Sequence, residues 1–325
     1  MSMSLEIPWV EKYRPKIFDD IVSQNIAINH LKELIKNPNM PHMIFAGPAG
    51  TGKTSTALII AETFLNKEDL SVNLLEVNAS DTVRIDFVRT VLKNYVNQNL
   101  IKDSSLKFVI LDEADNIPGQ VQQALRRIIE KASLNIKFIL LCNYINRLID
   151  PIISRCAVFR FVSLPKEKII ERLKYITKKE RLQIPPEKTE KFFELLFFIS
   201  GGDLRKAINT LQMSVSLDLL DNLELNEILR ISGFMDEKTL EDLTMALKNK
   251  DFGKSREIID SMETLDSRNF IRQLVEALPR VNIEPNEIPT LRSFIGEIDY
   301  RISRGANEKI QVSALLAEII ENIEL

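Results

Sequence analysis

The sequence contains little cysteine and no long apolar run, and these deficits narrow the classes of protein that it can encode. Only two cysteines, Cys142 and Cys156, occur in 325 residues, and neither lies in a C-x-x-C pair or near a histidine cluster. A disulfide framework or a zinc site is therefore not expected. No apolar run approaches the roughly 20 residues that span a bilayer, which excludes a membrane-spanning protein.

Export signals and a strong positive charge are also missing. The first fifteen residues have neither a basic start followed by an apolar block nor the acid-poor character of a transit peptide. We therefore expect the protein to remain where it is made. The net charge of -3 argues against a chain coated in positive charge, but a local basic stripe for nucleic acid remains compatible with it.

Strands and helices alternate in the first half of the chain. Short apolar runs read as buried strands at residues 42–47, 73–77, 107–113, 137–143 and 157–162, with amphipathic segments between them. This alternation predicts an α/β fold with a parallel sheet covered by helices on both faces. From Pro165 onward the spacing of apolar residues is helical. The predicted domains are an α/β core at 1–164, a small helical domain at 165–232 and a second helical domain at 233–325.

A phosphate-binding motif lies between the first predicted strand and the following helix. The octet "GPAGTGKT" fits G-x-x-x-x-G-K-[ST] and consists of Gly47, Pro48, Ala49, Gly50, Thr51, Gly52, Lys53 and Thr54. Its glycines allow backbone N–H groups to turn inward at a helix N-terminus and bind phosphate. Lys53 is expected to reach the β- and γ-phosphates, and the Thr54 hydroxyl to bind Mg²⁺.

Polar side chains end the third and fourth predicted strands. Asp112 and Glu113 come directly after an apolar strand, and Asn143 ends the strand after it. The carboxyl edge of a parallel sheet is where ligands bind. We therefore predict Asp112 as a magnesium partner and Glu113 as the general base for water. Asn143 could bind the γ-phosphate or simply end its strand, since asparagine tolerates turns.

Eight segments together resemble one protein family in the same order along the chain. They are "PWVEKYRPKIFDDIVSQ", "PHMIFAGPAGTGKT", "LEVNASD", "FVILDEADNI", "QQALRR", "SRCAVFRF", "GGDLRKAINTLQ" and "DYRISRGANEKIQVSALLA". The chain resembles the AAA+ ATPases and, more narrowly, the small subunits of replication factor C, the clamp loader of archaea and eukaryotes. The first and last segments are particular to clamp loaders. The resemblance covers almost the whole chain.

The resemblance implies a RecA-like ATPase domain, a helical lid and a helical collar that joins five subunits in a spiral. It implies ATP and Mg²⁺ as ligands. The expected partners are the large subunit, other small subunits, the sliding clamp (PCNA) and primer–template DNA, with no membrane. Such a protein works in the archaeal cytoplasm or, in a eukaryote, in the nucleus.

The same resemblance assigns further residues to the nucleotide site. Val10 and Val22 would line the adenine pocket, with Tyr13 and Arg14 nearby. Asn143 becomes the sensor of the γ-phosphate, and Arg205 in the lid becomes a second sensor. Ser55, directly after the motif, is included among the nucleotide-binding residues.

The sequence departs from the family pattern where the family faces DNA. The family usually has "NASDERGID", whereas this chain has "NASDTVRIDFVR". The basic residue has moved by one position, so Arg84 and Arg89 are the candidates for contacts with DNA phosphates, unless they are ordinary exposed helix charges. "GPAG" in place of the commoner "GPPG" is a smaller change.

Arg155 is the remaining cation of interest. By itself it reads as a surface charge. If the family topology holds, it lies on the opposite side of the domain from the phosphate loop, and in ring-forming ATPases a neighbour supplies the cation for the γ-phosphate. We therefore predict that Arg155 acts in trans as an arginine finger.

Two other classes of function stay open at this point. The first is a structural subunit that holds nucleotide but barely hydrolyses it. The second is another AAA+ DNA motor, for example one that drives branch migration. A winged-helix domain of such a motor would add strands near the C-terminus, where the pattern is helical.

Overall fold

The structure is a computed structural model of the whole chain. It describes residues 7–37, 39–79, 85–98, 106–132, 134–220, 223–262, 266–281, 283 and 286–322. Two compact units emerge from the packing. The first unit comprises Met1–Leu182 and Ser200–Gln212, and the second comprises Gln183–Ile199 and Met213–Leu325. The division into three domains stays a prediction.

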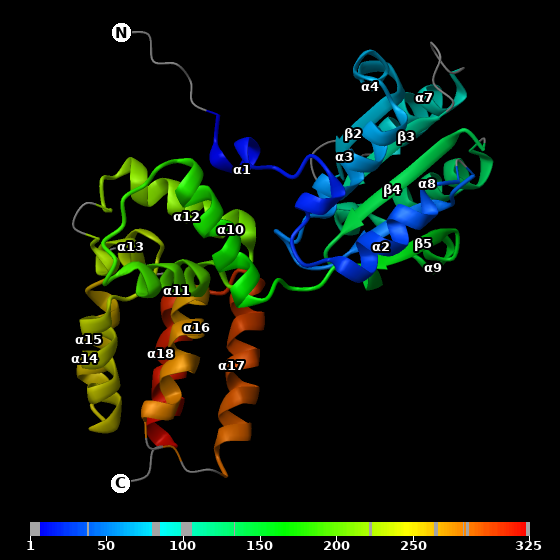
Figure 1. Cartoon of the computed structure of the whole chain (residues 1–325). Helices are drawn as coiled ribbons and strands as arrows, with labels where there is room; N and C mark the ends of the chain where they lie inside the picture. The colour runs from blue at the N-terminus through cyan, green and yellow to red at the C-terminus, as the bar shows by residue number, and fades with distance from the viewer. Residues whose placement is uncertain are drawn as a thin grey trace. The chain divides into compact units, whose positions relative to one another are not determined.

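A five-stranded parallel sheet forms the centre of the first unit (Figure 1). The strand order is β2-β3-β4-β1-β5, and every neighbouring pair is parallel. The strands are β1 (His42–Ala46), β2 (Leu74–Asn78), β3 (Lys107–Asp112), β4 (Ile136–Cys142) and β5 (Cys156–Arg160). The α/β prediction is confirmed, and each predicted strand agrees with an observed one to within two residues at either end.

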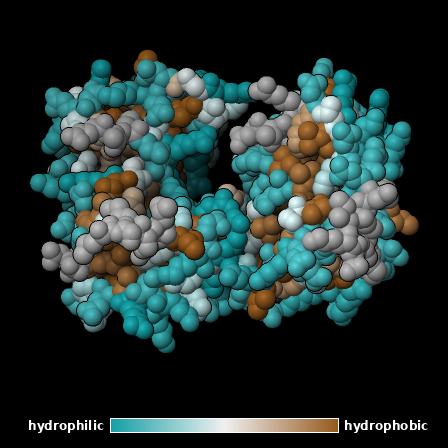
Figure 2. Space-filling model, turned by 90° about the horizontal axis from the view of Figure 1, so that it is seen from above, coloured by the Kyte–Doolittle hydropathy of each residue, from teal (hydrophilic) through white to brown (hydrophobic). Residues whose placement is uncertain are grey.

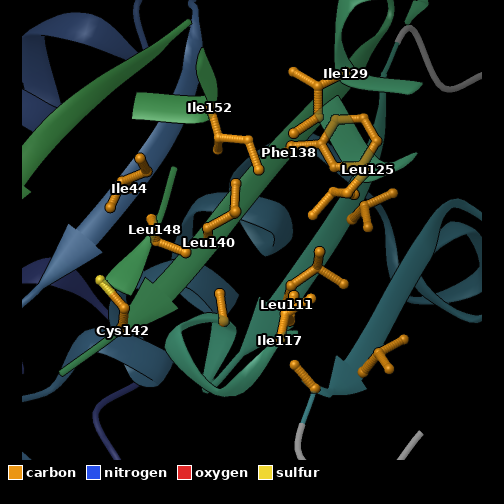
Figure 3. Packing of buried hydrophobic residues seen from close by; sticks show 14 of the residues in the cluster. Ile44, Leu111, Ile117, Leu125, Ile129, Phe138, Leu140, Cys142, Leu148 and Ile152 are labelled. Carbon is orange, nitrogen blue, oxygen red and sulfur yellow. The ribbon is translucent and has the colours of Figure 1, made fainter. Parts of the chain in front are cut away.

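Alternate residues of the central strands supply two separate hydrophobic cores. Phe138, Leu140 and Cys142 of β4 pack with residues of α8 (Gly119–Lys131), as Figure 3 shows for one face of the sheet. Ile139 and Leu141 join a second cluster with residues of helices α2 (Asn25–Leu34) and α3 (Lys53–Phe64). A strand that is apolar on both faces in this way needs helices on both sides.

Short elements complete the sheet domain, and longer helices follow it. The short ones are α1 (Trp9–Lys12), η1 (Phe18–Asp20), α4 (Lys67–Asn73), α6 (Ile85–Phe87), the π-helical turn η2 (Val88–Leu92), α7 (Lys93–Asn97), η3 (Ala114–Asn116), η4 (Ile145–Arg147) and α9 (Asp150–Ile153). The helices of the predicted lid are α10 (Lys166–Lys179), α11 (Thr189–Ser200), α12 (Leu204–Ser216) and α13 (Leu225–Ile231).

The N-terminal segment is tied to two of the lid helices within the first unit. The Trp9 backbone N–H donates to Gln212 Oε1 at 2.9 Å, and Arg172 Nη2 donates to the Tyr13 carbonyl oxygen at 2.8 Å. The Tyr13 hydroxyl donates to Glu180 Oε1 at 2.5 Å. Burial and this carboxylate raise the pKa of Tyr13 well above its usual value, so the hydroxyl stays protonated as a donor.

The second unit is built from helices around its own core. Leu243, Phe270, Ile298, Val312 and Leu315 are among its most buried residues. The helices around this core are α14 (Glu237–Lys248), α15 (Phe252–Asp260), α16 (Ser267–Ala277), α17 (Ile288–Ser303) and α18 (Glu308–Glu321), with η5 (Leu278–Arg280) between two of them. In the described part of residues 233–322 no strand of a winged-helix domain occurs.

The surface is mainly polar. Figure 2 shows hydrophilic residues over most of the visible face, with hydrophobic residues in separate patches. None of the helices among the described residues combines the length and the apolar character that crossing a membrane requires.

His42 at the start of β1 gives the fold a pH dependence. Burial, together with the charge of Lys137, lowers its pKa from about 6.5 to about 4. Its Nδ1 atom accepts the Phe138 N–H at 3.1 Å, which requires that atom to be unprotonated. The unfolded chain therefore binds a proton near pH 6.5 that the folded chain resists, so stability is complete above that pH and falls toward pH 4.

We predict that His42→Asn removes this contribution. The Asn carbonyl can still accept a hydrogen bond but does not titrate. Urea unfolding between about pH 7 and pH 4 gives the free energy of unfolding as a function of pH. This free energy should fall with decreasing pH more steeply in the wild type than in His42→Asn, by up to about 1.4 kcal/mol per pH unit. Equal slopes for the two proteins would contradict the assignment.

Candidate nucleotide-binding site

The predicted phosphate loop connects β1 to α3. Gly52 has φ 94° and directly precedes Lys53, the first residue of α3. The first turn of a helix leaves backbone N–H groups without helical partners, and these groups attract anions. Gly47 N–H donates to the Cys142 carbonyl oxygen at 3.1 Å, which joins the start of the loop to the end of β4. The loop therefore begins at the carboxyl edge of the sheet.

Lys53 points its ammonium group at three oxygens of this edge. Its Nζ atom donates to the carbonyl oxygens of Gly47 (2.7 Å) and Pro48 (2.8 Å) and to Asn143 Oδ1 (3.0 Å). The residue is only 8% exposed. Burial lowers the pKa of Lys53, and the nearby Asp112 carboxylate partly offsets this effect. A bound phosphate would act in the same direction as Asp112 and favour the charged amine.

The two carboxylates after β3 have different surroundings. Asp112 Oδ2 accepts the Thr54 hydroxyl at 2.9 Å, and its Oδ1 accepts the Glu113 N–H at 2.8 Å. Glu113 has φ 54° and ψ 38°, a left-handed conformation that costs a residue with a side chain about 1–2 kcal/mol. Its Oε2 accepts Asn116 Nδ2 at 3.2 Å. The tight turn therefore separates the two carboxylates into distinct environments.

The paired oxygens of Thr54 and Asp112 suit magnesium. Their hydrogen bond brings a hydroxyl and a carboxylate together beside the phosphate loop. Mg²⁺ in nucleotide sites usually takes only one or two protein oxygens and fills its other positions with water and phosphate. These donors therefore fit the predicted ion.

A single cavity gathers most of the predicted nucleotide residues, and all of its lining belongs to the first unit. The lining includes Val10, Arg14, Val22, Ala49, Gly50, Thr51, Gly52, Lys53, Thr54, Ser55, Asp112, Glu113, Asn143 and Arg205. Gly47 and Pro48 are not in the lining, although both bind Lys53. Arg172 of α10 also lines the cavity, and no motif in the sequence predicts it there.

The loop that begins α12 lies against the phosphate loop. Asp203 Oδ1 accepts the N–H groups of Arg205 (2.8 Å) and Lys206 (3.1 Å) and so caps α12. A Cβ atom added to Gly50 would lie 1.9 Å from the same oxygen. The lid therefore meets the phosphate loop at a position where only glycine fits.

Arg155 lies away from this cavity. It precedes β5, and His42 pairs with Cys156 in the register of β1 and β5. Arg155 is therefore at the amino edge of the sheet, roughly 16 Å along β1 from the phosphate loop. Its guanidinium binds Glu130 Oε1 at 2.5 Å and the Pro151 carbonyl oxygen at 2.6 Å. The structure does not bring it to the nucleotide site of its own chain.

The structure describes one of the two candidates for DNA contacts. Arg89 is exposed on η2. Arg84 lies outside the described residues. The DNA-contact predictions for both residues stay predictions.

The sheet order, the phosphate loop after β1 and the carboxylates after β3 define a P-loop ATPase of the AAA class. The family model "ATPase family associated with various cellular activities (AAA)" matches residues 43–164. A second model, "Replication factor C C-terminal domain", matches residues 235–318. The AAA family is a family of nucleotide-binding ATPases, so the chain carries an ATPase domain.

Curated relatives narrow the class to one family. Replication factor C small subunit 1 of Pyrobaculum islandicum is 38% identical over 317 residues, covering 97% of this chain and 94% of its own length. The replication factor C small subunit of Thermofilum pendens is 41% identical over 328 residues, covering 98% and 97%. The chain belongs to the replication factor C small subunit family, whose members are clamp-loader subunits of DNA replication. The predicted family is confirmed.

A solved structure of another protein is similar to this chain in fold alone. The RuvB Holliday junction branch migration motor of Thermotoga maritima superposes with a TM-score of 0.53, covering 84% of this chain and 93% of that one. Its identity is 18%, so the likeness extends to architecture and not to activity.

We predict that Gly50→Ala disturbs the contact between lid and phosphate loop. Its φ of 68° already costs an alanine about 1–2 kcal/mol, and the new Cβ collides with Asp203. Thermal unfolding should show a lower midpoint, and nucleotide affinity should fall. Gly119→Ala is the matched control, because nothing lies within 4 Å of its Cβ position. Equal behaviour of the two variants would contradict this reading.

Proposed function

We propose that this protein hydrolyses ATP with Mg²⁺ in the described cavity and uses that reaction to open the sliding clamp (PCNA) and load it on primer–template DNA. It works as a small subunit beside the large subunit and other small subunits in a ring of five. The observation that carries the proposal is the meeting of Lys53, Asn143 and the Thr54–Asp112 pair at one sheet edge.

The roles proposed for the residues follow from their surroundings. Lys53, held among three oxygens, binds the β- and γ-phosphates. Thr54 and Asp112 hold Mg²⁺, which when bound neutralises phosphate charge. Glu113 takes a proton from the attacking water. Asn143 contacts the γ-phosphate.

The remaining lining residues are assigned either to the adenine base of the nucleotide or to the predicted lid. Val10, Arg14 and Val22 line the cavity, and in this proposal they contact the adenine. Arg205 projects into the same cavity from α12 and is suited to sense the γ-phosphate from the lid side.

Hydrolysis in this proposal depends on a subunit interface. Arg155 cannot serve its own site from the amino edge of the sheet, so it stabilises the γ-phosphate bound to a neighbour. Its ion pair with Glu130 is partly exposed, with side chains 36% and 30% accessible. Such pairs contribute little free energy, so Arg155 can exchange Glu130 for phosphate at small cost.

The collar, lid and DNA face complete the proposal. Helices α14–α18 join subunits, and Arg84 and Arg89 contact DNA phosphates. A protein with these partners acts beside the chromosome, in the cytoplasm of an archaeal cell or in a eukaryotic nucleus.

We predict that two substitutions in the cavity remove different properties, one ATP binding and the other hydrolysis alone. Lys53→Ala should abolish ATP binding, because the main cation for the phosphates is removed. Glu113→Gln should bind ATP with unchanged affinity and lose hydrolysis, because only the base is lost. Equilibrium binding of a fluorescent ATP analogue and steady-state phosphate release measure the two effects.

The same pair of variants tests the alternative of a structural subunit that holds nucleotide without hydrolysing it. A subunit that only holds nucleotide would load the clamp equally well with Glu113→Gln, and that result would overturn the role of hydrolysis. Loss of binding in both variants would overturn the separate roles of lysine and glutamate.

We predict that Arg155 acts in trans. Rings of Arg155→Ala subunits should bind ATP normally and hydrolyse it up to about 10³-fold more slowly. Rings of Lys53→Ala subunits should also be inactive. Mixed rings should regain turnover, because an Arg155→Ala site keeps its own lysine and receives the arginine of a Lys53→Ala neighbour.

Controls separate this effect from a general loss of charge. Arg160→Ala removes an exposed arginine from the end of β5 and should leave turnover unchanged. Arg155→Lys should rescue only partly, because an ammonium cannot make the planar two-oxygen contact of a guanidinium. Mixed rings that remain inactive would show that Arg155 acts in cis and would end this proposal.

A further inference from the structure

A buried carboxylate, Asp115, lies beside the site without a role in the proposed reaction. It is in η3, two residues after Glu113, and is 7% exposed. Its two oxygens accept the Asn143 N–H, each at 3.3 Å, and Oδ2 also accepts the Tyr144 N–H at 3.1 Å. The turn after β3 is therefore joined to the first two residues after β4.

These hydrogen bonds fall where the sheet no longer orders the backbone. β4 ends at Cys142, so the next N–H groups lie beyond the ladder. A carboxylate is a strong acceptor for such groups because its bonds are charge-assisted. It fixes the backbone at Asn143, and this in turn restricts where the Asn143 side chain can point.

The restricted side chain is the one that faces Lys53. Asn143 Oδ1 accepts Lys53 Nζ at 3.0 Å. A continuous path of hydrogen bonds thus runs from Asp115 through Asn143 to the lysine of the phosphate loop. Asp115 is absent from the cavity lining, so it would act on the γ-phosphate through Asn143, although its charge also raises the pKa of Lys53.

We propose that Asp115 is a positioning residue that sets the orientation of Asn143 and thereby the ability of the site to distinguish ATP from ADP. This inference rests on the proposed contact between Asn143 and the γ-phosphate. It assigns the third acidic residue of the "DEAD" segment to the sensing of the γ-phosphate, whereas Asp112 and Glu113 serve the metal and the water.

The test compares ATP and ADP affinity in four proteins. They are the wild type, Asp115→Asn, Asn143→Ala and the double variant. Asp115→Asn keeps the size of the side chain but turns one acceptor into a donor that faces an N–H group. Equilibrium binding of both nucleotides to the purified chain, with Mg²⁺, gives the ratio of affinities. Asp19→Asn, an exposed acid of the same unit, is the matched control.

We expect Asp115→Asn to reduce the preference for ATP over ADP about tenfold, with ADP affinity unchanged. The double variant should be no worse than Asn143→Ala, because Asp115 acts through Asn143. If Asp115 had a general structural role, Asp115→Asn would instead weaken the binding of both ATP and ADP. The double variant would then lose affinity by the product of the two single-variant factors. Independent, multiplying losses would overturn the proposal.

A second variant at position 115 is needed in case Asp115→Asn destabilises the fold. Asp115→Glu retains the charge but displaces it by one methylene, so it should show the same loss of preference. Thermal unfolding reports whether each variant is intact. Wild-type preference in either intact variant would overturn the proposal.

Two other variants show whether the proposed function itself, and not only the role of Asp115, is wrong. In that case Lys53→Ala would bind ATP like the wild type, and Asn143→Ala would leave the preference unchanged. If only the present inference fails, those two variants behave as predicted and Asp115→Asn matches the wild type.

Discussion

The parallel pairing of β3, β4 and β1 is the constraint on which the site depends. Parallel strands end at the same edge, so residues far apart in the chain meet there without a dedicated scaffold. Thr54 and Asp112 are 58 residues apart and share a hydrogen bond, and Lys53 reaches Asn143 across 90 residues. Apolar side chains on both faces of these strands secure the pairing that makes such contacts possible.

The N-terminal segment and lid close the site from the other side. Tyr13 is held by Arg172 and Glu180 of the α10 region, while Asp203 lies against Gly50. The cavity therefore includes residues from both ends of the first unit. A nucleotide that filled this cavity would contact the phosphate loop, the N-terminal segment and α12 together.

Most of the fold and much of the site were predictable from local patterns. The strands follow from apolar runs of the right length, and the phosphate loop follows from glycines at fixed spacing. Asp115 and Arg172 were not found this way. A carboxylate that binds backbone N–H groups 28 and 29 residues away has no local signature, and an arginine on an amphipathic helix resembles an ordinary surface charge.

The sequence by itself determined which side chains are available to this protein: a phosphate-loop motif, the residues proposed to bind a metal ion and to activate water, and several cations, in the order typical of its family. The tertiary structure decided which of these groups meet. It placed Asn143 beside Lys53, Arg205 in the cavity and Arg155 at the opposite edge of the sheet. Residue type and spacing describe what a side chain can do, but strand order and direction decide what lies within hydrogen-bonding distance of it.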